Sequence, residues 1–259
     1  MAKFGAKHPC FAPIATEPDN AAPTYGVGAE IGKLVAANLT VNLASGELFA
    51  DDILAEQLSE FASGTLVMET DDMVAEIAGM VYGATVNGNR VTYNKGDTAP
   101  LGGLGYYKVM MRNGVKYYEG YYYPKVRAAL GNDNAQTRGN SITFSTTSTT
   151  FTVFAPNAGD WRETETFTTE EAAKLWIENK LGLATAYEIN VATSGDGTVS
   201  PLGRTMVAAG GSFVLNVGAD ITKLYDNGVD VTASIDAGDR YTLATMAADH
   251  DIVAVFTGE

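Results

Sequence analysis

Hydrophobic and polar residues alternate along residues 30–43. Odd positions such as Leu39 and Val41 are apolar there, whereas Asn38 and other even positions are polar. A period of two predicts a half-buried β-strand, and this one is unusually long. Residues 64–70, GTLVMET, predict a second strand, and the acid-rich segment ELFADDILAEQLSE lies between the two.

A short helix is predicted after the second strand. Asp71 or Asp72 can serve as its N-cap, and the helical spacing ends near Gly83. Residues 86–93 then predict a further strand region, which is followed by the Gly/Asp/Pro loop NKGDTAPLGG. The apolar stripe of the helix consists of Met73, Val74, Ile77 and Val81.

Residues 105–126 predict a β-hairpin that contains seven of the 13 tyrosines. Asn113 and Gly114 are the residues that a two-residue type I′ turn requires, and the turn fixes the register of the two strands. Both faces of this hairpin are largely apolar or aromatic, so we expect its own core to cover one face and more chain or another subunit to cover the other. The predicted cross-strand pairs are Arg112 with Val115, Met110 with Tyr117, Lys108 with Glu119, and Tyr106 with Tyr121.

A second helix, TTEEAAKLWIENKLG, follows two strands predicted at residues 142–146 and 151–154. Thr168 and Glu171 form a capping box at its start, and Gly182 stands at its C-cap. Residues 1–184 therefore predict a β-rich α+β unit. The helix residues expected to face inward are Ala173, Trp176, Ile177 and Leu181.

The N-terminal segment is rich in proline. Four of the eight prolines fall in the first 23 residues, which argues against a regular helix or an interior strand. Residues 1–26 therefore predict an extended arm. Two interpretations remain open, a frayed terminus and an arm laid over a neighbouring subunit.

The pattern of hydrophobic and polar residues changes at Tyr187. Strand-length segments (YEINVA, SFVLNV, RYTLATM, DIVAVF) recur between turn signals (SGDG, AGG, DNG, DAGD), and no helical period is present. Residues 185–259 therefore predict a small, separate β-sandwich. The net charge of −14 is divided evenly, with −7 before Tyr187 and −7 from there on.

Composition narrows the possible functions. Lys and Arg total 17 against 31 Asp and Glu, and no basic run is dense enough to neutralise a phosphate backbone, which disfavours ordinary nucleic-acid binding. Cys10 is the one cysteine, so no intramolecular disulfide can form. The first residues lack the apolar region of a secretory signal and no apolar run is long enough to span a bilayer, so we expect a protein made and kept in the cytoplasm, with no membrane partner.

The search for catalytic or metal-binding groups finds little. His8 and His250 are the only histidines, no GxSxG motif is present, and the GGLG segment lacks the Lys-Ser/Thr of a phosphate-binding loop. The acidic turns at residues 226–228 and 236–239 lack the ligand spacing of an EF-hand. A carboxylate pair from Asp51, Asp52 and Glu56 is a weak hydrolase alternative. We expect no enzyme activity, no cofactor and no metal.

The succession of motifs resembles one protein family. ADD and FASGTL, then GM-x-YG, then GLGYY-x-V-x-x-x-NG-x-x-YYEGYYYPKV, TRGNSITFSTTS and W-x-E-x-E-x-F-T-T-x-E-A-A-x-x-W resemble the major tail proteins of long-tailed, non-contractile bacteriophages. The resemblance covers residues 1–183 and rests on the order of the motifs. It implies a β-sandwich or barrel domain with two short helices and a long β-hairpin that forms hexameric rings, stacked into a tube that conducts DNA.

The resemblance also implies sites and partners. In that family a β-hairpin from each subunit joins a continuous barrel around the lumen. The resemblance implies that this hairpin consists of the strand from Glu30 and the strand at residues 64–70. Implied partners are other copies of the chain, the tape-measure, tail-terminator and tail-tip proteins, and DNA that passes without specific binding; the implied location is the virion tail. Candidate lumen-facing acids are Glu47, Asp51, Asp52, Glu56 and Glu60. Candidate subunit-interface residues are Tyr106, Tyr107, Tyr117, Tyr118, Tyr121, Tyr122 and Tyr123.

Residues 185–259 resemble bacterial immunoglobulin-like or surface-repeat modules through SGDGTVSPLG, AAGGSFVLNV, YDNGVDVT and ADHDIVAVF. This resemblance implies a peripheral decoration domain that adheres weakly to host cell-surface glycans. The alternative for the whole chain is a bacterial cell-surface adhesin whose tyrosine-rich hairpin binds carbohydrate. We expect a tube protein to self-assemble and an adhesin to stay monomeric.

Overall fold

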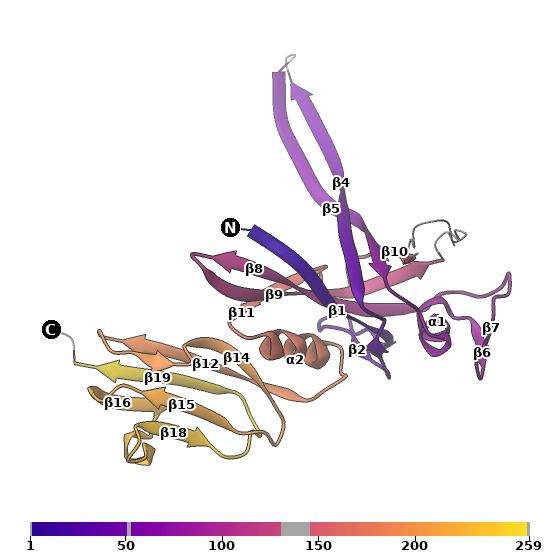
Figure 1. The fold of residues 1–259 in the computed structure, drawn as a ribbon. Helices are drawn as coiled ribbons and strands as arrows, with labels where there is room; N and C mark the ends of the chain where they lie inside the picture. The colour runs from indigo at the N-terminus through magenta and orange to yellow at the C-terminus, as the bar shows by residue number, and fades with distance from the viewer. Residues whose placement is uncertain (1, 51–52, 131–145, 258–259) are drawn as a thin grey trace, which may run out of the picture.

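A nine-stranded sheet forms the larger part of the molecule (Figure 1). The structure is a computed structural model and describes residues 2–50, 53–130 and 146–257. The strand order is β2-β1-β8-β9-β10-β5-β4, with β11 paired to β9 and β3 to β1. These strands are β1 Ala2–Thr16, β2 Thr24–Tyr25, β3 Ala29–Glu30, β4 Leu34–Ala50, β5 Ile53–Thr70, β8 Leu101–Arg112, β9 Val115–Ala129, β10 Thr147–Val153 and β11 Glu163–Phe167. The fold is mainly β, as expected.

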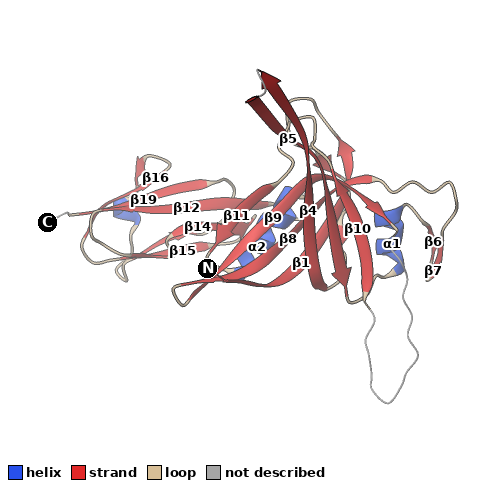
Figure 2. Ribbon diagram, turned by 90° about the horizontal axis from the view of Figure 1, so that it is seen from above, coloured by secondary structure: helices blue, strands red, loops and turns tan. Residues whose placement is uncertain are grey.

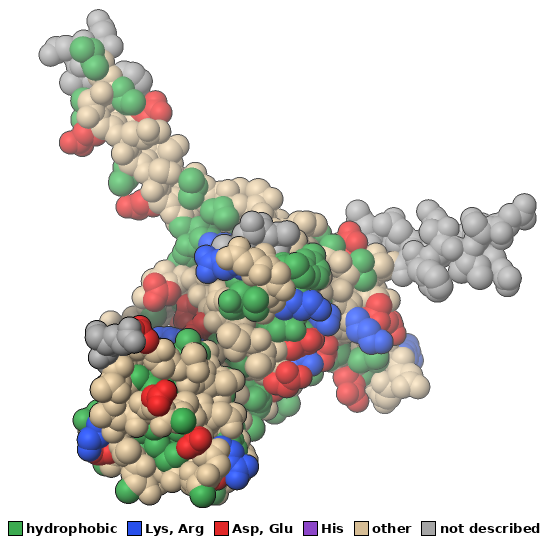
Figure 3. Space-filling model, turned by 60° about the vertical axis from the view of Figure 1, so that its left-hand side comes forward, with side chains coloured by type: hydrophobic (Ala, Val, Ile, Leu, Met, Phe, Trp, Pro, Cys, Tyr) green, Lys and Arg blue, Asp and Glu red, His purple; other side chains and the backbone are tan. Residues whose placement is uncertain are grey.

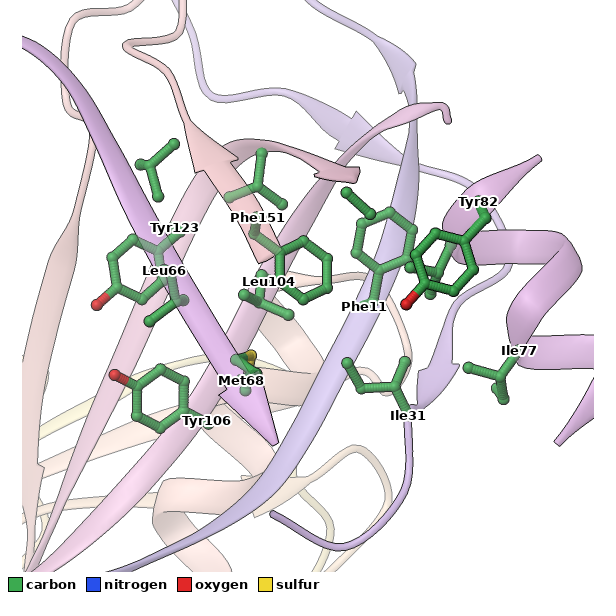
Figure 4. Close-up of a cluster of buried hydrophobic side chains, with 14 of the residues drawn as sticks. Phe11, Ile31, Leu66, Met68, Ile77, Tyr82, Leu104, Tyr106, Tyr123 and Phe151 are labelled. Carbon is green, nitrogen blue, oxygen red and sulfur yellow. The ribbon is translucent and has the colours of Figure 1, made fainter. Parts of the chain in front are cut away.

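Two hydrophobic clusters cover the two faces of this sheet. On one face the base of the β4–β5 hairpin and helix α1 (Ala75–Tyr82) bury Leu66 and Met68 against Leu104 and Phe151 (Figure 4). On the other face helix α2 (Glu170–Lys180) packs Trp176 on the sheet. The part of the tyrosine-rich hairpin near the body is therefore covered on both faces by its own chain, whereas residues 111–116 around its turn are exposed.

The register of the tyrosine-rich hairpin is confirmed. β8 and β9 pair with Lys108 opposite Glu119, and the other three predicted pairs are also present. Asn113 and Gly114 have φ angles of 51° and 80°, as a type I′ turn requires. The residues expected at 86–93 form two short strands, β6 (Thr85–Asn87) and β7 (Arg90–Thr92). The strand expected at 142–146 lies almost wholly outside the described residues.

The expectation of an N-terminal arm is wrong. β1 lies inside the sheet between β2 and β8, and Phe11 is fully buried. The strand tolerates Pro9 because its pairing with β8 shifts between Lys7 and Cys10, so the missing N–H falls in an irregularity. The Pro9 carbonyl accepts a hydrogen bond from the Ile31 N–H (2.8 Å). β1 is thus neither frayed nor free to lie over a neighbour.

Both helices are present, but their starts differ from the prediction. α1 begins after Val74 without a side-chain cap, and the Asp71 carboxylate instead accepts a hydrogen bond from the Lys33 N–H (2.7 Å). At α2 the N-cap is Thr169, one residue later than predicted, and its hydroxyl accepts from the Ala172 N–H. The four helix residues expected to face inward, Ala173, Trp176, Ile177 and Leu181, are all buried.

The C-terminal residues form the small β-sandwich that the sequence predicts. A five-stranded sheet, β14-β12-β19-β16-β17, packs on a three-stranded sheet, β13-β15-β18, around a core that includes Ile189 and Leu215. Met206 contacts the cluster under α2, which joins this unit to the larger one. The strands are β12 Ala186–Ser194, β13 Val199–Ser200, β14 Gly203–Ala208, β15 Phe213–Val217, β16 Ile221–Asp226, β17 Val229–Asp230, β18 Arg240–Leu243 and β19 His250–Phe256, with the 3-10 turn Thr232–Ser234.

Seen from above, the small sandwich and α1 lie at opposite ends of the large sheet (Figure 2). Within the described part of the chain, neither helix has the length or the apolar composition needed to cross a membrane.

Candidate assembly site

The β4–β5 hairpin projects far beyond the body of the molecule (Figure 1). Its strands pair from Leu34 opposite Thr70 to Ala50 opposite Ile53. β10 pairs only with the last seven residues of β5, from Gly64 to Thr70. The distal part of the hairpin is therefore a ribbon of two strands. The acid-rich segment, which the sequence placed between two strands, is itself largely strand.

This ribbon exposes two free strand edges. β4 ends the order of the large sheet, and its outer edge has no partner among the described residues. Residues 53–63 of β5 pair with β4 alone in the same part of the chain. Unpaired edges expose rows of N–H and C=O groups that invite another strand, and a two-stranded ribbon is marginally stable in water. Both edges of the distal ribbon are therefore available for pairing with another strand.

The two faces of the hairpin differ. On the core-side face, Leu39 lies opposite Leu66 and both pack in the hydrophobic cluster. On the opposite face, Thr40 faces Thr65, and the Asn42 amide donates to the Ser63 hydroxyl (3.2 Å). That face stays small and polar as far as Ala44 and Glu60, which lie opposite each other. It has the character of a surface that remains in contact with water.

Beyond this polar stretch the hairpin carries an apolar tip, defined by Leu48, Ile53, Leu54 and Leu58. Their side chains are exposed by 57%, 70%, 45% and 63%, respectively. Figure 3 shows hydrophobic and acidic side chains alternating along the projecting arm. An exposed apolar cluster of this kind marks an interaction site or an aggregation liability.

An aromatic stack fixes the base of the hairpin. Phe61 and Trp161 lie parallel, with ring centroids 4.2 Å apart and an interplanar angle of 4°. The Arg162 guanidinium lies over the Trp161 ring at 4.9 Å. In the sequence Trp161 stands out only as part of a motif. No spacing rule connects it with Phe61, which lies 100 positions earlier.

The candidate lumen acids do not form one row. Leu48 lies opposite Glu56 and Ala44 opposite Glu60, which places Glu56 and Glu60 on the same face. Glu47 points to the other face, where it accepts a hydrogen bond from Gln57. Glu56 and Glu60 thus share one face of the ribbon, and Glu47 lies on the other. Asp51 and Asp52 lie outside the described residues.

Most of the candidate interface tyrosines are in the core. Five of them are at most 7% exposed. The base of the β4–β5 hairpin covers those on one sheet face, and α2 covers those on the other. Burial raises the pKa of Tyr122 to about 12. Tyr117 and Tyr118 are half-buried and remain accessible to a partner. The interface expectation is corrected for Tyr106, Tyr107, Tyr121, Tyr122 and Tyr123, whose side-chain surface the protomer already covers.

The histidines have structural partners in separate parts of the fold. His8 lies between the Glu30 and Glu178 carboxylates, at 3.2 and 3.0 Å. His250 Nδ1 lies 2.8 Å from the Asp226 carboxylate. Among residues 2–50, 53–130 and 146–257, no three His, Cys, Asp or Glu side chains converge as metal ligands would. Glu56, named in the hydrolase alternative, stands exposed on a ribbon and not in a cleft.

No protein-family model matches this chain, and no curated protein matches it.

Proposed function

We propose that this chain is the structural subunit of a bacteriophage tail tube, which self-assembles into stacked hexameric rings around a channel for DNA. The observation that carries the proposal is the β4–β5 hairpin, with its two free edges, its polar face and its apolar tip. The family resemblance of residues 1–183 supplies the tube and the ring number. In a monomer the β4–β5 hairpin leaves leucines and strand edges exposed, which lowers solubility, and assembly would cover them.

Ring closure uses the free edges. The outer edge of β4 in one copy pairs antiparallel with residues 53–63 of β5 in the next copy. Such a head-to-tail contact joins different surfaces of each subunit and closes into a ring where the rotation allows it. A closed ring leaves no free strand edge, which removes the pairing hazard that the isolated protomer presents.

The polar face of the hairpin lines the channel. Asn38, Thr40, Asn42 and Glu60 lie on the face opposite the hydrophobic cluster, so the core-side face is turned toward the protein wall. That face also carries Val67 opposite Asn38, but its described residues include no lysine or arginine, so it gives phosphates no attractive site. DNA then passes without binding, and the tape-measure protein occupies the same channel before it.

The small sandwich lies on the outside of the tube. It joins the body through α2, and α2 covers the sheet face opposite the hairpin base. The Arg204 guanidinium on β14 pairs with Glu165 on β11 at 2.8 Å, which links the two units outside the core. A peripheral position suits the decoration role that the resemblance implies, including weak contact with host glycans.

Burial weakens the adhesin alternative. An adhesin of this kind needs solvent-exposed tyrosine rings that stack on sugars. Five of the seven tyrosine rings of the β8–β9 hairpin are instead buried within the protomer. No other observation in the structure favours it, so we propose the tube function alone.

Negative-stain electron microscopy of the purified protein over a range of concentrations, with its mass in solution, tests the proposal. We expect rings or hollow tubes that share a constant diameter. A variant in which Asn-Gly replaces residues 44–60, which removes the ribbon and closes the remaining strands with a two-residue turn, is the matched control and should remain monomeric. A wild-type chain that stays monomeric with and without a tape-measure protein, and behaves like the control, contradicts the proposal.

A further inference from the structure

A hollow of about 260 Å³ lies on the distal part of the β8–β9 hairpin. Met110 is buried at its base and Tyr117 is half-buried beside it, so the hollow has an apolar floor. It lies on the same sheet face as Tyr106, which the base of the β4–β5 hairpin covers. The residues that line it are Lys3, Met110, Arg112, Tyr117, Glu119 and Thr166.

The hollow is positively charged in a chain of net charge −14. Lys3 is paired with Glu119, but Lys108 lies beside them over the Tyr121 ring at 4.8 Å. Burial, with the nearby charge of Lys3, lowers the pKa of Lys108. Arg112 is exposed and has no carboxylate partner among the described residues. The site therefore suits a segment that is apolar at its centre and acidic at its border.

The apolar tip of the β4–β5 hairpin has this chemistry. Leu48 and Leu58 share one face, and Glu56 lies directly opposite Leu48 on that face. Both leucines are more than half exposed, and Glu56 has no ion-pair partner among the described residues. Packing the leucines on Met110 and Tyr117 would remove apolar surface from water and bring Glu56 to Arg112.

Within one protomer the end of the β4–β5 hairpin lies far from the turn of β8–β9 (Figures 1 and 2), and the hollow is lined by residues near that turn. A contact between them must join two copies. Because the two surfaces differ, the contact is head-to-tail and repeats from copy to copy.

We propose that the hairpin tip of one copy docks into the Lys3–Arg112 hollow of a neighbouring copy, with Leu48 and Leu58 on the apolar floor and Glu56 paired with Arg112. The inference rests on the proposed self-assembly and names its contact. It also gives Glu56 a different role from Glu60, which remains on the channel-lining part of the same face.

Charge reversal tests the contact. Arg112→Glu should raise the protein concentration needed for half-maximal assembly about tenfold or more, since each factor of ten corresponds to about 1.4 kcal/mol. Adding Glu56→Arg should restore assembly to within about threefold of wild type, because the swapped pair attracts again. Lys116→Glu makes the same charge change on the opposite face of the same hairpin and should have no effect. Unchanged assembly of Arg112→Glu, or no rescue by the swap, overturns the proposal.

Cross-linking separates this inference from the tube function. Leu58→Cys and Tyr117→Cys variants, mixed and treated with a short bis-maleimide, should give covalent dimers, while Leu58→Cys with Lys116→Cys should not. Cys10 is buried and will not compete. Tubes without the specific dimer remove the tip contact and leave the proposed function standing. A specific dimer from a protein that never forms rings or tubes keeps the contact and removes the tube.

Discussion

Phe61 and Trp161 stack face to face at 4.2 Å, and this contact joins the base of the projecting hairpin to the loop between β10 and β11. Trp161 is only half-buried, so the stack is a clamp at the surface and not part of the deep core. An edge-paired assembly needs hairpins that all leave the body in one direction. The Phe61–Trp161 stack fixes the direction of the hairpin within one protomer, as the proposed assembly requires.

Trp161→Ala should loosen the hairpin while the fold survives. We expect a loss of roughly 1–2 kcal/mol in the free energy of unfolding and faster protease cleavage within the hairpin, because an aromatic pair contributes about 0.5–1.5 kcal/mol beyond its buried area. Tyr93→Ala, which removes a half-exposed ring elsewhere, is the control for general destabilisation. Equal cleavage rates in the two variants would show that the stack does not hold the hairpin.

Two glycines with open space around them should respond differently to alanine. Gly114 has φ of 80° in the hairpin turn, so Gly114→Ala should cost about 1–2 kcal/mol through backbone strain alone. Gly46 lies in β4 with ordinary strand geometry, so Gly46→Ala should change stability by less than about 0.5 kcal/mol or increase it. Chemical denaturation of both variants measures the difference. Similar losses at the two positions would contradict the assignment of a type I′ turn.

Local turn chemistry explains why part of this fold was predictable. Asn113-Gly114 sets the register of β8 and β9 without reference to the rest of the chain, and every predicted pair is present. The start of α2 was missed by one residue, because Thr168 and Thr169 offer equivalent hydroxyls and only the backbone geometry decides between them.

Features that depend on distant contacts were not predictable. Prolines argued against β1 as an interior strand, and only its pairing irregularities show how the strand is accommodated. The sequence pattern of the acid-rich segment predicts a loop between two strands, because its side chains are exposed. Its backbone is nevertheless paired as a strand ribbon. A tyrosine suits a core and an interface equally well, so the burial of Tyr106 and Tyr122 required the structure.

Removing residues 185–259 should leave assembly intact. The sandwich contacts α2 and β11, and neither the hairpin edges nor the apolar tip touches it in one protomer. The truncated chain exposes surface around Trp176, so its folding must be verified by near-ultraviolet circular dichroism first. Loss of tubes from a folded truncation would show that the sandwich is part of the tube wall.

The Cys10 thiol should resist alkylation in the native protein. It is 1% exposed, and burial raises its pKa, so little reactive thiolate is present at neutral pH. Labelling by iodoacetamide should therefore follow unfolding, and its rate should rise steeply through the denaturation midpoint. Labelling of the folded protein as fast as that of a free thiol would contradict the position of β1 inside the sheet.

Glu60→Lys should leave ring formation unchanged and slow the passage of DNA. Glu60 lies on the polar face assigned to the channel, so a lysine there presents an attractive charge to phosphates where wild type presents a repulsive one. The effect should shrink as salt is raised, because screening shortens the reach of the charge. Glu47→Lys, an equal charge change on the opposite face, is the control and should have little effect on ejection. Ejection rates from assembled particles measure both variants, and slower ejection with Glu47→Lys than with Glu60→Lys would mean that the core-side face lines the channel.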